Sequence, residues 1–286
     1  MPFEQIAVLG AGLLGGSLAL AVPARLGGAA RVRLWARRAE TVAEAQELGI
    51  EGATGDLRVA LDGADLVILS TPVGAFPGLA ARMLECGVSP SALVTDVASV
   101  KRLPHEALGA MLAAAGLDFI GSHPMAGSEK NGVGAAAANL FDGAACILTN
   151  DGGVGHGRLT ELTRFWQALG SRCETMSAQL HDDLVARISH LPHVLAAVGA
   201  KVALAQPADG RLGGGGLRDT TRVAGGDAAM WAEILLENRA ALERPLRDAA
   251  AGLSEMLAML EACDHEGLRR WLEGAKQLRD GLPTSR

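Results

Sequence analysis

Short apolar runs and longer segments with helical spacing alternate along the first half of the chain. Runs bounded by glycine, proline or charged residues predict strands at 5–10, 31–35, 64–70, 92–97, 118–121 and 144–149. Helical composition fills intervals at 13–26, 41–48 and 103–115. Thr41 is the expected N-cap of the second of these helices. Strands that alternate with helices favour an α/β fold, a doubly wound parallel sheet with helices on both faces.

The pattern changes at the glycine-rich stretch 150–155, which is the predicted domain boundary. Beyond it strand signals mostly stop, and segments rich in Ala, Leu and Glu have helical spacing at 158–169, 179–205, 228–260 and 265–278. Pro245 is expected to kink or divide the third segment. We therefore predict a first domain at 1–150 and an all-helical domain at 151–286. The long apolar faces of the second domain indicate a homodimer, because one small helical layer cannot bury them.

Composition and charge narrow the class of protein. The chain of 286 residues is 49% apolar and 20% charged, as in ordinary globular proteins, and it has a net charge of -6 and only 3% aromatic residues. An acidic chain with few aromatic side chains is poorly suited to bind nucleic acid. The apolar run 13–22 is shorter than the roughly 18 residues that a membrane helix needs. We therefore expect a cytoplasmic protein without nucleic-acid or membrane partners.

The cysteines and histidines give no sign of a metal site. Four cysteines, at 86, 146, 173 and 263, form no CxxC pair, so we expect free thiols in a reducing compartment. His181, His190 and His193 are close in sequence, but their spacing fits no standard zinc pattern and we predict no metal. The adjacent pair Asp182-Asp183 is interpreted as a solvated helix face.

The first predicted strand ends in a glycine-rich loop, Gly10-Ala11-Gly12-Leu13-Leu14-Gly15, that opens the first helix. In this context G-x-G-x-x-G predicts a Rossmann-type dinucleotide site. Gly10 permits the tight turn, Gly12 lets the backbone approach a pyrophosphate, and Gly15 lets helix and strand pack closely. Free N–H groups at the helix N-terminus attract phosphates. The expected cofactor contacts are Gly10, Gly12, Leu13, Leu14, Gly15 and, at the end of the strand 64–70, Ser70, Thr71 and Pro72.

The end of the second strand indicates which dinucleotide is bound. An NAD site usually has Asp or Glu there, about 20 residues after the glycines, to bind the ribose hydroxyls. This chain has no acid there and continues with Arg37 and Arg38. Guanidinium groups match a phosphate in a fork geometry. We therefore predict that Arg37 and Arg38 bind the cofactor and that NADP is preferred over NAD.

Further clusters of polar residues lie where a substrate would meet the cofactor. The segments 96–101 and 121–129 follow strands, whose carboxyl ends carry the ligand sites of a parallel sheet. His123 is therefore a candidate acid or base near neutral pH. In the helical domain, Arg222 is a candidate clamp for a carboxylate, with Asp219 orienting it. Lys101 is either a further cation for an anionic substrate or an organiser of its loop.

These segments together resemble the prephenate/arogenate dehydrogenase family of tyrosine biosynthesis. The resemblance runs from the glycine loop to about residue 238. It is carried by the segments 10–17, 99–101, 122–129, 189–193, 214–224, 230–231 and 236–238. It implies a nicotinamide domain followed by a helical dimerisation domain. The implied reaction is oxidative decarboxylation of prephenate, arogenate or both, with hydride transfer to NAD(P).

The resemblance also implies roles for individual residues. His123 is expected to deprotonate the ring hydroxyl of the substrate, with Ser99 assisting, and Arg222 to bind a substrate carboxylate. With Lys101 and Asp219, the expected substrate contacts are His193, Glu129 and Trp231, the last supplied by the partner subunit. Many members carry a fused regulatory or mutase domain, which we do not expect here.

Two other classes of protein share parts of this pattern. A different two-domain NAD(P)-dependent reductase, acting on a hydroxy acid or an imine, would have the same glycine loop and helical second domain. A non-catalytic dinucleotide-sensing regulator would keep the fold but lose the catalytic groups. The combination of His123, Ser99 and Arg222 favours the dehydrogenase over both.

Overall fold

The computed structural model describes residues 3–127 and 130–282. These residues form two compact units, 1–238 and 239–286. The larger unit contains a six-stranded sheet, a smaller three-stranded sheet and several helices, whereas the smaller unit is a pair of helices.

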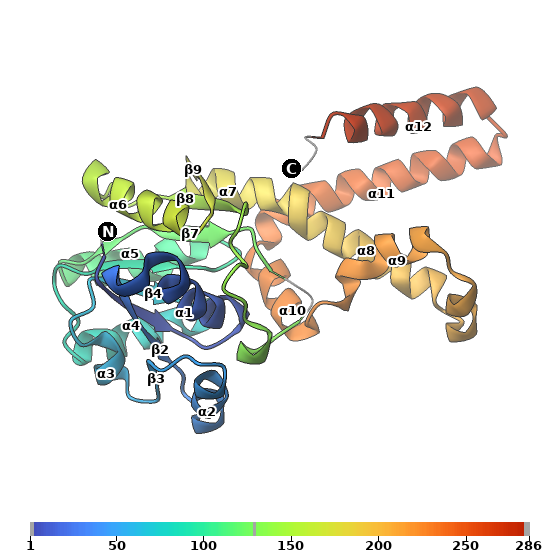
Figure 1. Cartoon of the computed structure of the whole chain (residues 1–286). Coiled ribbons are helices and arrows are strands. Elements are labelled where there is room, and N and C mark those ends of the chain that lie inside the picture. The colour runs from blue at the N-terminus through green and yellow to red at the C-terminus, as the bar shows by residue number, and fades with distance from the viewer. Residues whose placement is uncertain (1–2, 128–129, 283–286) are drawn as a thin grey trace. The chain divides into compact units, whose positions relative to one another are not determined.

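The six-stranded sheet is entirely parallel and has the order β3-β2-β1-β4-β5-β6 (Figure 1). Its strands are β1 (Gln5–Leu9), β2 (Arg31–Trp35), β3 (Ala53–Thr54), β4 (Leu66–Leu69), β5 (Leu93–Asp96) and β6 (Asp118–Phe119). The strand order reverses between β1 and β4, where a doubly wound sheet opens a crevice at the carboxyl ends of its strands. The predicted Rossmann-type fold is confirmed.

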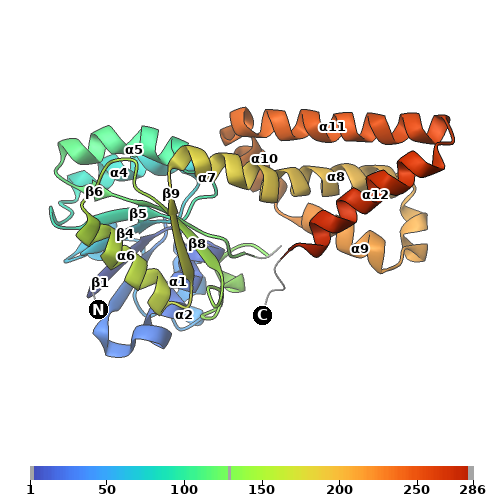
Figure 2. The ribbon, with the colours of Figure 1, turned by 90° about the horizontal axis from the view of Figure 1, so that it is seen from above.

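Helices cover both faces of this sheet, as Figure 2 shows. They are α1 (Leu13–Leu26), α2 (Ala39–Glu47), α3 (Leu57–Leu61), α4 (Phe76–Glu85) and α5 (Arg102–Ala114). Alternate residues of β1 point to opposite faces, so that Ile6 and Val8 belong to one buried apolar cluster and Ala7 and Leu9 to the other. The expected N-cap at Thr41 is wrong, because the chain enters α2 directly after Arg38.

The smaller sheet has the order β7-β8-β9, with β7 antiparallel and β9 parallel to β8. Its strands are β7 (Gly121–Pro124), β8 (Ala145–Thr149) and β9 (Arg172–Met176), and α6 (His156–Ala168) connects the last two. The predicted strand at 118–121 is therefore divided between two sheets. Sheet structure continues past the glycine-rich stretch 150–155, which lies between β8 and α6, and ends at Met176.

The remaining elements are helical, as expected. They are α7 (Ala178–Val185), a π-helical turn (Ala186–His190), α8 (Leu191–Ala203), α9 (Gly215–Thr221) and α10 (Ala228–Glu237), and, in the smaller unit, α11 (Arg239–Glu261) and α12 (His265–Asp280). Pro192 in the first turn of α8 has no N–H to donate, which accounts for the widened turn before it. No described helix has the length and hydropathy needed to span a membrane.

Pro245 was expected to kink or divide segment 228–260, and the division does not occur there. The helix instead breaks at Asn238, and α11 runs without interruption through Pro245. Asn238 is buried, and its amide donates to the carbonyl oxygen of Asp182 at 2.9 Å and lies 3.1 Å from Nδ1 of His190. These bonds hold the end of α10 against α7 and the turn that follows it.

Candidate functional site

The glycine loop has the backbone geometry that the sequence predicts. Gly10 has φ 126°, and a Cβ built on it would lie 2.3 Å from the carbonyl oxygen of Ser70. A Cβ on Gly15 would lie 1.9 Å from the carbonyl oxygen of Gly10. A Cβ on Gly12 would meet no atom within 4 Å. Two of the glycines are therefore required by the protein itself, whereas the free side of Gly12 is available to a ligand.

The chain around this loop fits the pyrophosphate of a dinucleotide. Helix α1 begins at Leu13, with no side-chain cap at Gly12 and no acidic residue in its first turn. Its first N–H groups and the positive end of its dipole are thus left for an anion. The hydroxyl of Thr71 is buried without a hydrogen-bond partner in the described structure. The expected contacts Ser70, Thr71 and Pro72 follow β4, and the backbone of Ser70 adjoins Gly10.

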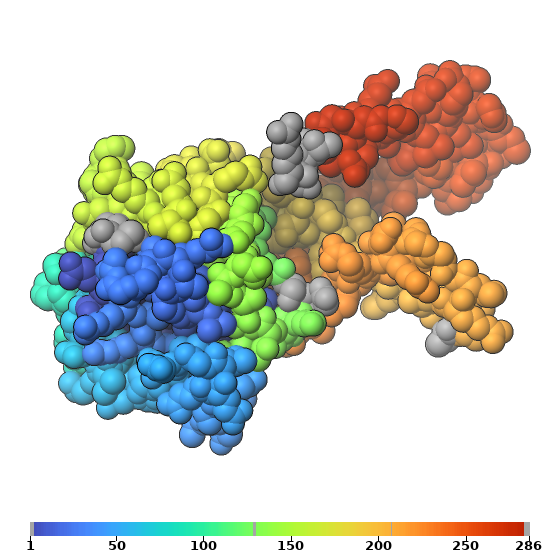
Figure 3. All heavy atoms as spheres, in the orientation of Figure 1, coloured from blue at the N-terminus to red at the C-terminus, as the bar shows by residue number. Residues whose placement is uncertain are grey.

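A 3₁₀ turn (Val133–Ala135) in the loop that follows β7 packs against α1 and α2, and Figure 3 shows the green atoms of this region beside the blue atoms of the first helices. A Cβ on Gly16 would lie 2.9 Å from both Val133 and Ala136 of this loop. The backbone N–H of residue 137 donates to Oγ of Ser17 at 3.0 Å. Small residues in α1 therefore allow the loop to lie close to the dinucleotide site.

Arg37 and Arg38 lie at the end of β2, as predicted, and both are exposed. Neither forms a salt bridge to a described residue. The preceding Trp35 is buried, and its indole N–H donates to the carbonyl oxygen of Gly55 at 3.1 Å. Two cations are thus presented at the position where an NAD site has an acid.

His123 lies within β7, not after a parallel strand as the sequence suggests, and only 8% of its surface is exposed. Its Nδ1 is 2.8 Å from Nε2 of His181, on α7. Burial lowers the pKa of His123 well below 6.5, and the neighbouring His181, Lys101 and His190 lower it further. His123 is therefore neutral at neutral pH, as a general base must be.

Asp182 continues the same chain of hydrogen bonds. Its Oδ1 is 2.8 Å from Nδ1 of His181, and it accepts from the backbone N–H groups of Lys101 at 2.7 Å and Arg102 at 3.1 Å. The interpretation of Asp182 as a solvated helix face is wrong, because only 2% of the residue is exposed. Two successive backbone donors at the start of α5 hold its carboxylate.

Lys101 does not face a substrate pocket. Its side chain is completely buried, and its ammonium is paired with the carboxylate of Asp96. Asp96 also accepts from the backbone N–H of Ser122 at 3.2 Å, so the pair connects β5 to β7. A Cβ on Gly121 would lie 2.5 Å from Oγ1 of Thr149 and 3.0 Å from Cδ of Lys101. The prediction that Lys101 contacts the substrate is therefore wrong. The alternative prediction, that Lys101 organises its loop, fits this geometry.

Ser99, the second expected catalytic residue, is half-buried in the turn that leads from β5 to α5. The Asp96–Lys101 pair joins the end of this turn to β5, and the backbone N–H of Ser122 joins β7 to the same Asp96. Ser99 and His123 therefore lie on segments that the buried ion pair fixes relative to each other.

His193 and Trp231 are brought together by α8 and α10. Their rings stack with centroids 3.6 Å apart and an angle of 11°. His193 is buried, and its Nδ1 has no partner among the described residues. Trp231 makes this contact with His193 of its own chain, and its expected contribution to the partner subunit's site stays a prediction. Burial lowers the pKa of the adjacent His190 to about 4.

Arg222 and Asp219 lie where α9 passes into a 3₁₀ turn (Arg222–Gly225) that packs on α8. Both side chains are exposed, and they form no ion pair with each other in the described structure. The prediction that Asp219 orients Arg222 is therefore not met. Glu129, a further expected substrate contact, lies outside the described residues.

Three residues of this network were missed by sequence reasoning: His181, Asp182 and Asn238. The sequence does contain a signal, because His181, Asp182 and His190 lie on one stretch of helix together with the expected His193. Within the described ranges, no group of three or more His, Cys, Asp or Glu residues is arranged to hold a metal.

Comparison with known proteins agrees with both halves of the chain. The family model of the prephenate dehydrogenase nucleotide-binding domain matches residues 20–175. The model of the prephenate dehydrogenase dimerization domain matches residues 177–274. The two matches meet at Met176, where β9 ends.

Individual relatives match over most of their length. Prephenate dehydrogenase of Bacillus subtilis is 32% identical, covering 98% of this chain and 76% of the relative. Cyclohexadienyl dehydrogenase of Zymomonas mobilis is 31% identical, covering 99% of this chain and 97% of the relative. The crystal structure of Aquifex aeolicus prephenate dehydrogenase with hydroxyphenyl propionate and NAD+ has a TM-score of 0.85 at 31% identity, covering 96% and 97% of the two chains.

Proposed function

The chain belongs to the prephenate dehydrogenase family, and we propose that it catalyses the oxidative decarboxylation of prephenate, arogenate or both in tyrosine biosynthesis. The product is 4-hydroxyphenylpyruvate or tyrosine, together with carbon dioxide and the reduced nicotinamide cofactor. The observation that carries the proposal is a buried, neutral His123 that is hydrogen-bonded on the side of Nδ1. Its Nε2 remains to act on a substrate.

The proposed role of His123 follows from its protonation state. When held at the glycine loop, NAD(P) would supply the acceptor for the hydride that leaves the carbon carrying the ring hydroxyl. His123 takes the proton of that hydroxyl at Nε2 as the oxygen becomes a carbonyl. When carbon dioxide leaves, its bonding electrons complete the aromatic ring, and His123 returns the proton to the phenolic oxygen. The proton balance at His123 closes within one turnover.

Substrate binding requires cations, because prephenate carries two carboxylates. We propose Arg222 as the group that binds one of them, since its guanidinium is exposed and unpaired with any described acid. His193, whose Nδ1 lacks a partner, and the stacked Trp231 are proposed to form a wall of the same pocket. Ser99 is proposed to assist His123 at the ring hydroxyl.

NADP is the proposed preferred cofactor. The support is the pair Arg37 and Arg38 at the end of β2, exposed and free of acidic partners in the described part of the chain. The relative from A. aeolicus holds NAD+ in its crystal structure. A 2′-phosphate would be bound by the fork of a guanidinium, which a carboxylate at this position would repel.

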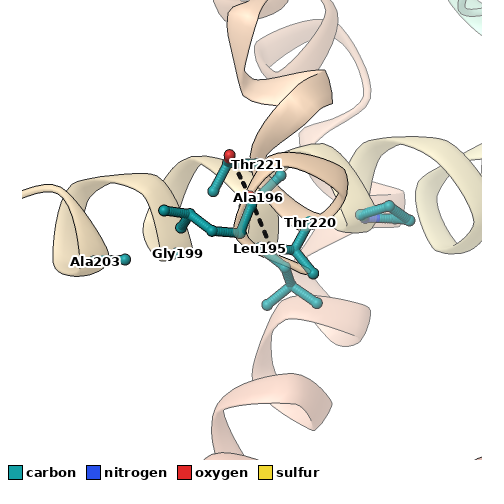
Figure 4. A pocket seen from close by; sticks show the side chains of 8 residues that line it. Leu195, Ala196, Gly199, Ala203, Thr220 and Thr221 are labelled. Atoms are coloured by element: carbon teal, nitrogen blue, oxygen red, sulfur yellow. Dashed lines mark hydrogen bonds between the residues drawn. The ribbon is translucent and has the colours of Figure 1, made fainter. Parts of the chain in front are cut away.

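We also propose that the protein is a homodimer. The matched family model from residue 177 onward is described as a dimerization domain. In the larger unit, α8 exposes Leu195, Val198 and Val202. Leu195 also lines an apolar pocket of about 350 Å³ with residues of α9 (Figure 4). In the smaller unit, α11 exposes a leucine every three or four residues, at 253, 257 and 260, a spacing that forms one helix face.

The test is to follow formation of reduced cofactor with prephenate and with arogenate, each paired with NAD and with NADP. We expect turnover with at least one of the two substrates and a higher kcat/KM for NADP. The controls are a hydroxy acid and an imine, which the alternative reductase would use. Turnover of a control in the absence of activity on either cyclohexadienyl substrate would overturn the proposal. A clear preference for NAD would overturn the cofactor assignment alone.

A further inference from the structure

Three side chains from two elements form an unbroken line of hydrogen bonds ending at the proposed base. Nδ1 of His123, on β7, is 2.8 Å from Nε2 of His181, on α7. Nδ1 of His181 is 2.8 Å from Oδ1 of Asp182. The rings of the two histidines meet edge to face, at 62°, and all three side chains are buried.

Asp182, at the end of the line away from His123, determines which atom donates in each of these hydrogen bonds. The carboxylate of Asp182 already accepts from the backbone N–H groups of Lys101 and Arg102, so it meets His181 as an acceptor. His181 therefore carries its proton on Nδ1, and in the neutral ring Nε2 is an acceptor. His123 must then donate from Nδ1. Its Nε2 is left without a proton.

We propose that Asp182, acting through His181, holds His123 in the tautomer that accepts a proton at Nε2 and stabilises the imidazolium formed in the reaction. This inference rests on the proposed function, in which His123 takes the proton of the substrate hydroxyl. His181 and Asp182 are positioning residues, because they act through His123. During the step, one proton passes from the substrate oxygen to Nε2 and later returns. The Nδ1 proton stays in its bond to His181.

The other charged or titratable groups near His123 do not supply this effect. Lys101, in the turn before α5, is a cation, and its charge is compensated by Asp96. His190, after α7, is neutral because burial lowers its pKa to about 4. Cys146, which pairs with Pro124 beside His123, is a neutral thiol on β8 because burial raises its pKa. Among the residues that the structure describes, Asp182 alone places an uncompensated negative charge in line with the ring.

The variant Asp182→Asn tests the charge of this line, and Asp183→Asn is its matched control. The adjacent Asp183 lies on the same helix, is only half-buried and has no ion pair to a described residue. The Asn amide at position 182 keeps one carbonyl acceptor but loses the charge. Both variants are assayed for kcat, for KM and for the pH dependence of kcat/KM.

We expect Asp182→Asn to lower kcat by about 10- to 100-fold, less than the roughly 10⁴-fold seen when the acid bonded directly to a triad histidine is replaced. KM should stay within about twofold of wild type, as expected when an interaction of the transition state is lost. The acid limb of the profile should move to lower pH, because loss of the anion disfavours the protonated ring. A drop in kcat without this movement of the acid limb would indicate a merely structural role and would overturn the proposal. The proposal would also be overturned if Asp182→Asn had the same kcat and pH profile as the control Asp183→Asn.

A spectroscopic test needs no variant of His181 or Asp182. The ¹⁵N shifts of the imidazole rings in the wild-type holoenzyme, assigned with His123→Asn, should show His123 protonated at Nδ1 and bare at Nε2. The opposite tautomer would refute the proposal even if Asp182→Asn fails to fold. If instead His123→Asn keeps normal turnover, the proposed base is wrong, while the observed tautomer still reports on the line of bonds.

Discussion

The glycine loop allows a paired experiment in which one added methyl group perturbs folding and another perturbs binding. In Gly15→Ala the new Cβ would lie 1.9 Å from the carbonyl oxygen of Gly10, which is backbone and cannot rotate away. Overpacking of this kind costs up to about 3 kcal/mol. For a domain of this size, that corresponds to a decrease in Tm of about 6–12 °C.

The outcome for Gly12→Ala is expected to be the reverse. Its Cβ meets no protein atom within 4 Å, and its φ of -92° suits alanine, so the free energy of unfolding should change by less than about 1 kcal/mol. The methyl group would occupy the side from which the pyrophosphate approaches. Cofactor affinity should therefore fall at least about tenfold, equal to about 1.4 kcal/mol.

Thermal unfolding of the cofactor-free protein and calorimetric titration with NADP and NAD separate the two effects. Gly15→Ala should have a lower Tm than wild type, whereas Gly12→Ala should have an unchanged Tm and a lower affinity for the dinucleotide. Wild-type affinity in Gly12→Ala would show that the dinucleotide does not lie against this glycine. A wild-type Tm in Gly15→Ala would show that α1 moves away from β1 easily, and the argument from close packing would fail.

Four further predictions follow from the site and the helical faces. His123→Asn should lower kcat by about 10²–10⁴-fold, and near-normal turnover would rule out the general base. Arg222→Ala should raise the KM for substrate strongly, and a loss confined to kcat would move Arg222 from binding to chemistry. Since burial lowers the pKa of His123, kcat/KM should be level near neutral pH and fall only well below pH 6.5, as the ring is protonated; constant activity into that acidic range would contradict the base. Light scattering after gel filtration should give a dimer, and a stable, active monomer would refute the proposed interface.

The elements that could be predicted from sequence are those whose pattern of apolar residues is compatible with only one type of secondary structure. The central strands β1, β4 and β5 are apolar because helices cover both faces of the sheet, and such runs are read as strands without difficulty. In contrast, β9 is mostly exposed and contains Arg172, Glu174 and Thr175. Strand β7, Gly-Ser-His-Pro, is buried but has no apolar run, because its buried side chains make polar contacts. Neither strand has a pattern that differs from a loop.

The candidate site divides in the same way. The glycine loop could be predicted because local sequence determines its backbone, whereas the role of His123 stays a prediction and its place within β7 was not foreseen. The burial of Lys101 and Asp182 could not be predicted, because a charged residue considered alone is expected to be exposed to solvent. Their burial depends on partners that are distant in sequence. The N–H group that binds Asp182 lies 81 residues away in the chain.

These buried charges also explain how one site accommodates both the neutral and the protonated form of His123. The carboxylates of Asp96 and Asp182 and the ammonium of Lys101 are enclosed together, and two negative charges and one positive charge leave one negative charge. With neutral histidines the enclosed network is thus one positive charge short of balance. Burial keeps His123 unprotonated in the resting enzyme, and in the proposed reaction the proton that it takes from the substrate would supply the missing charge. A site built in this way favours the imidazolium only while the reaction generates it, as transition-state stabilisation requires.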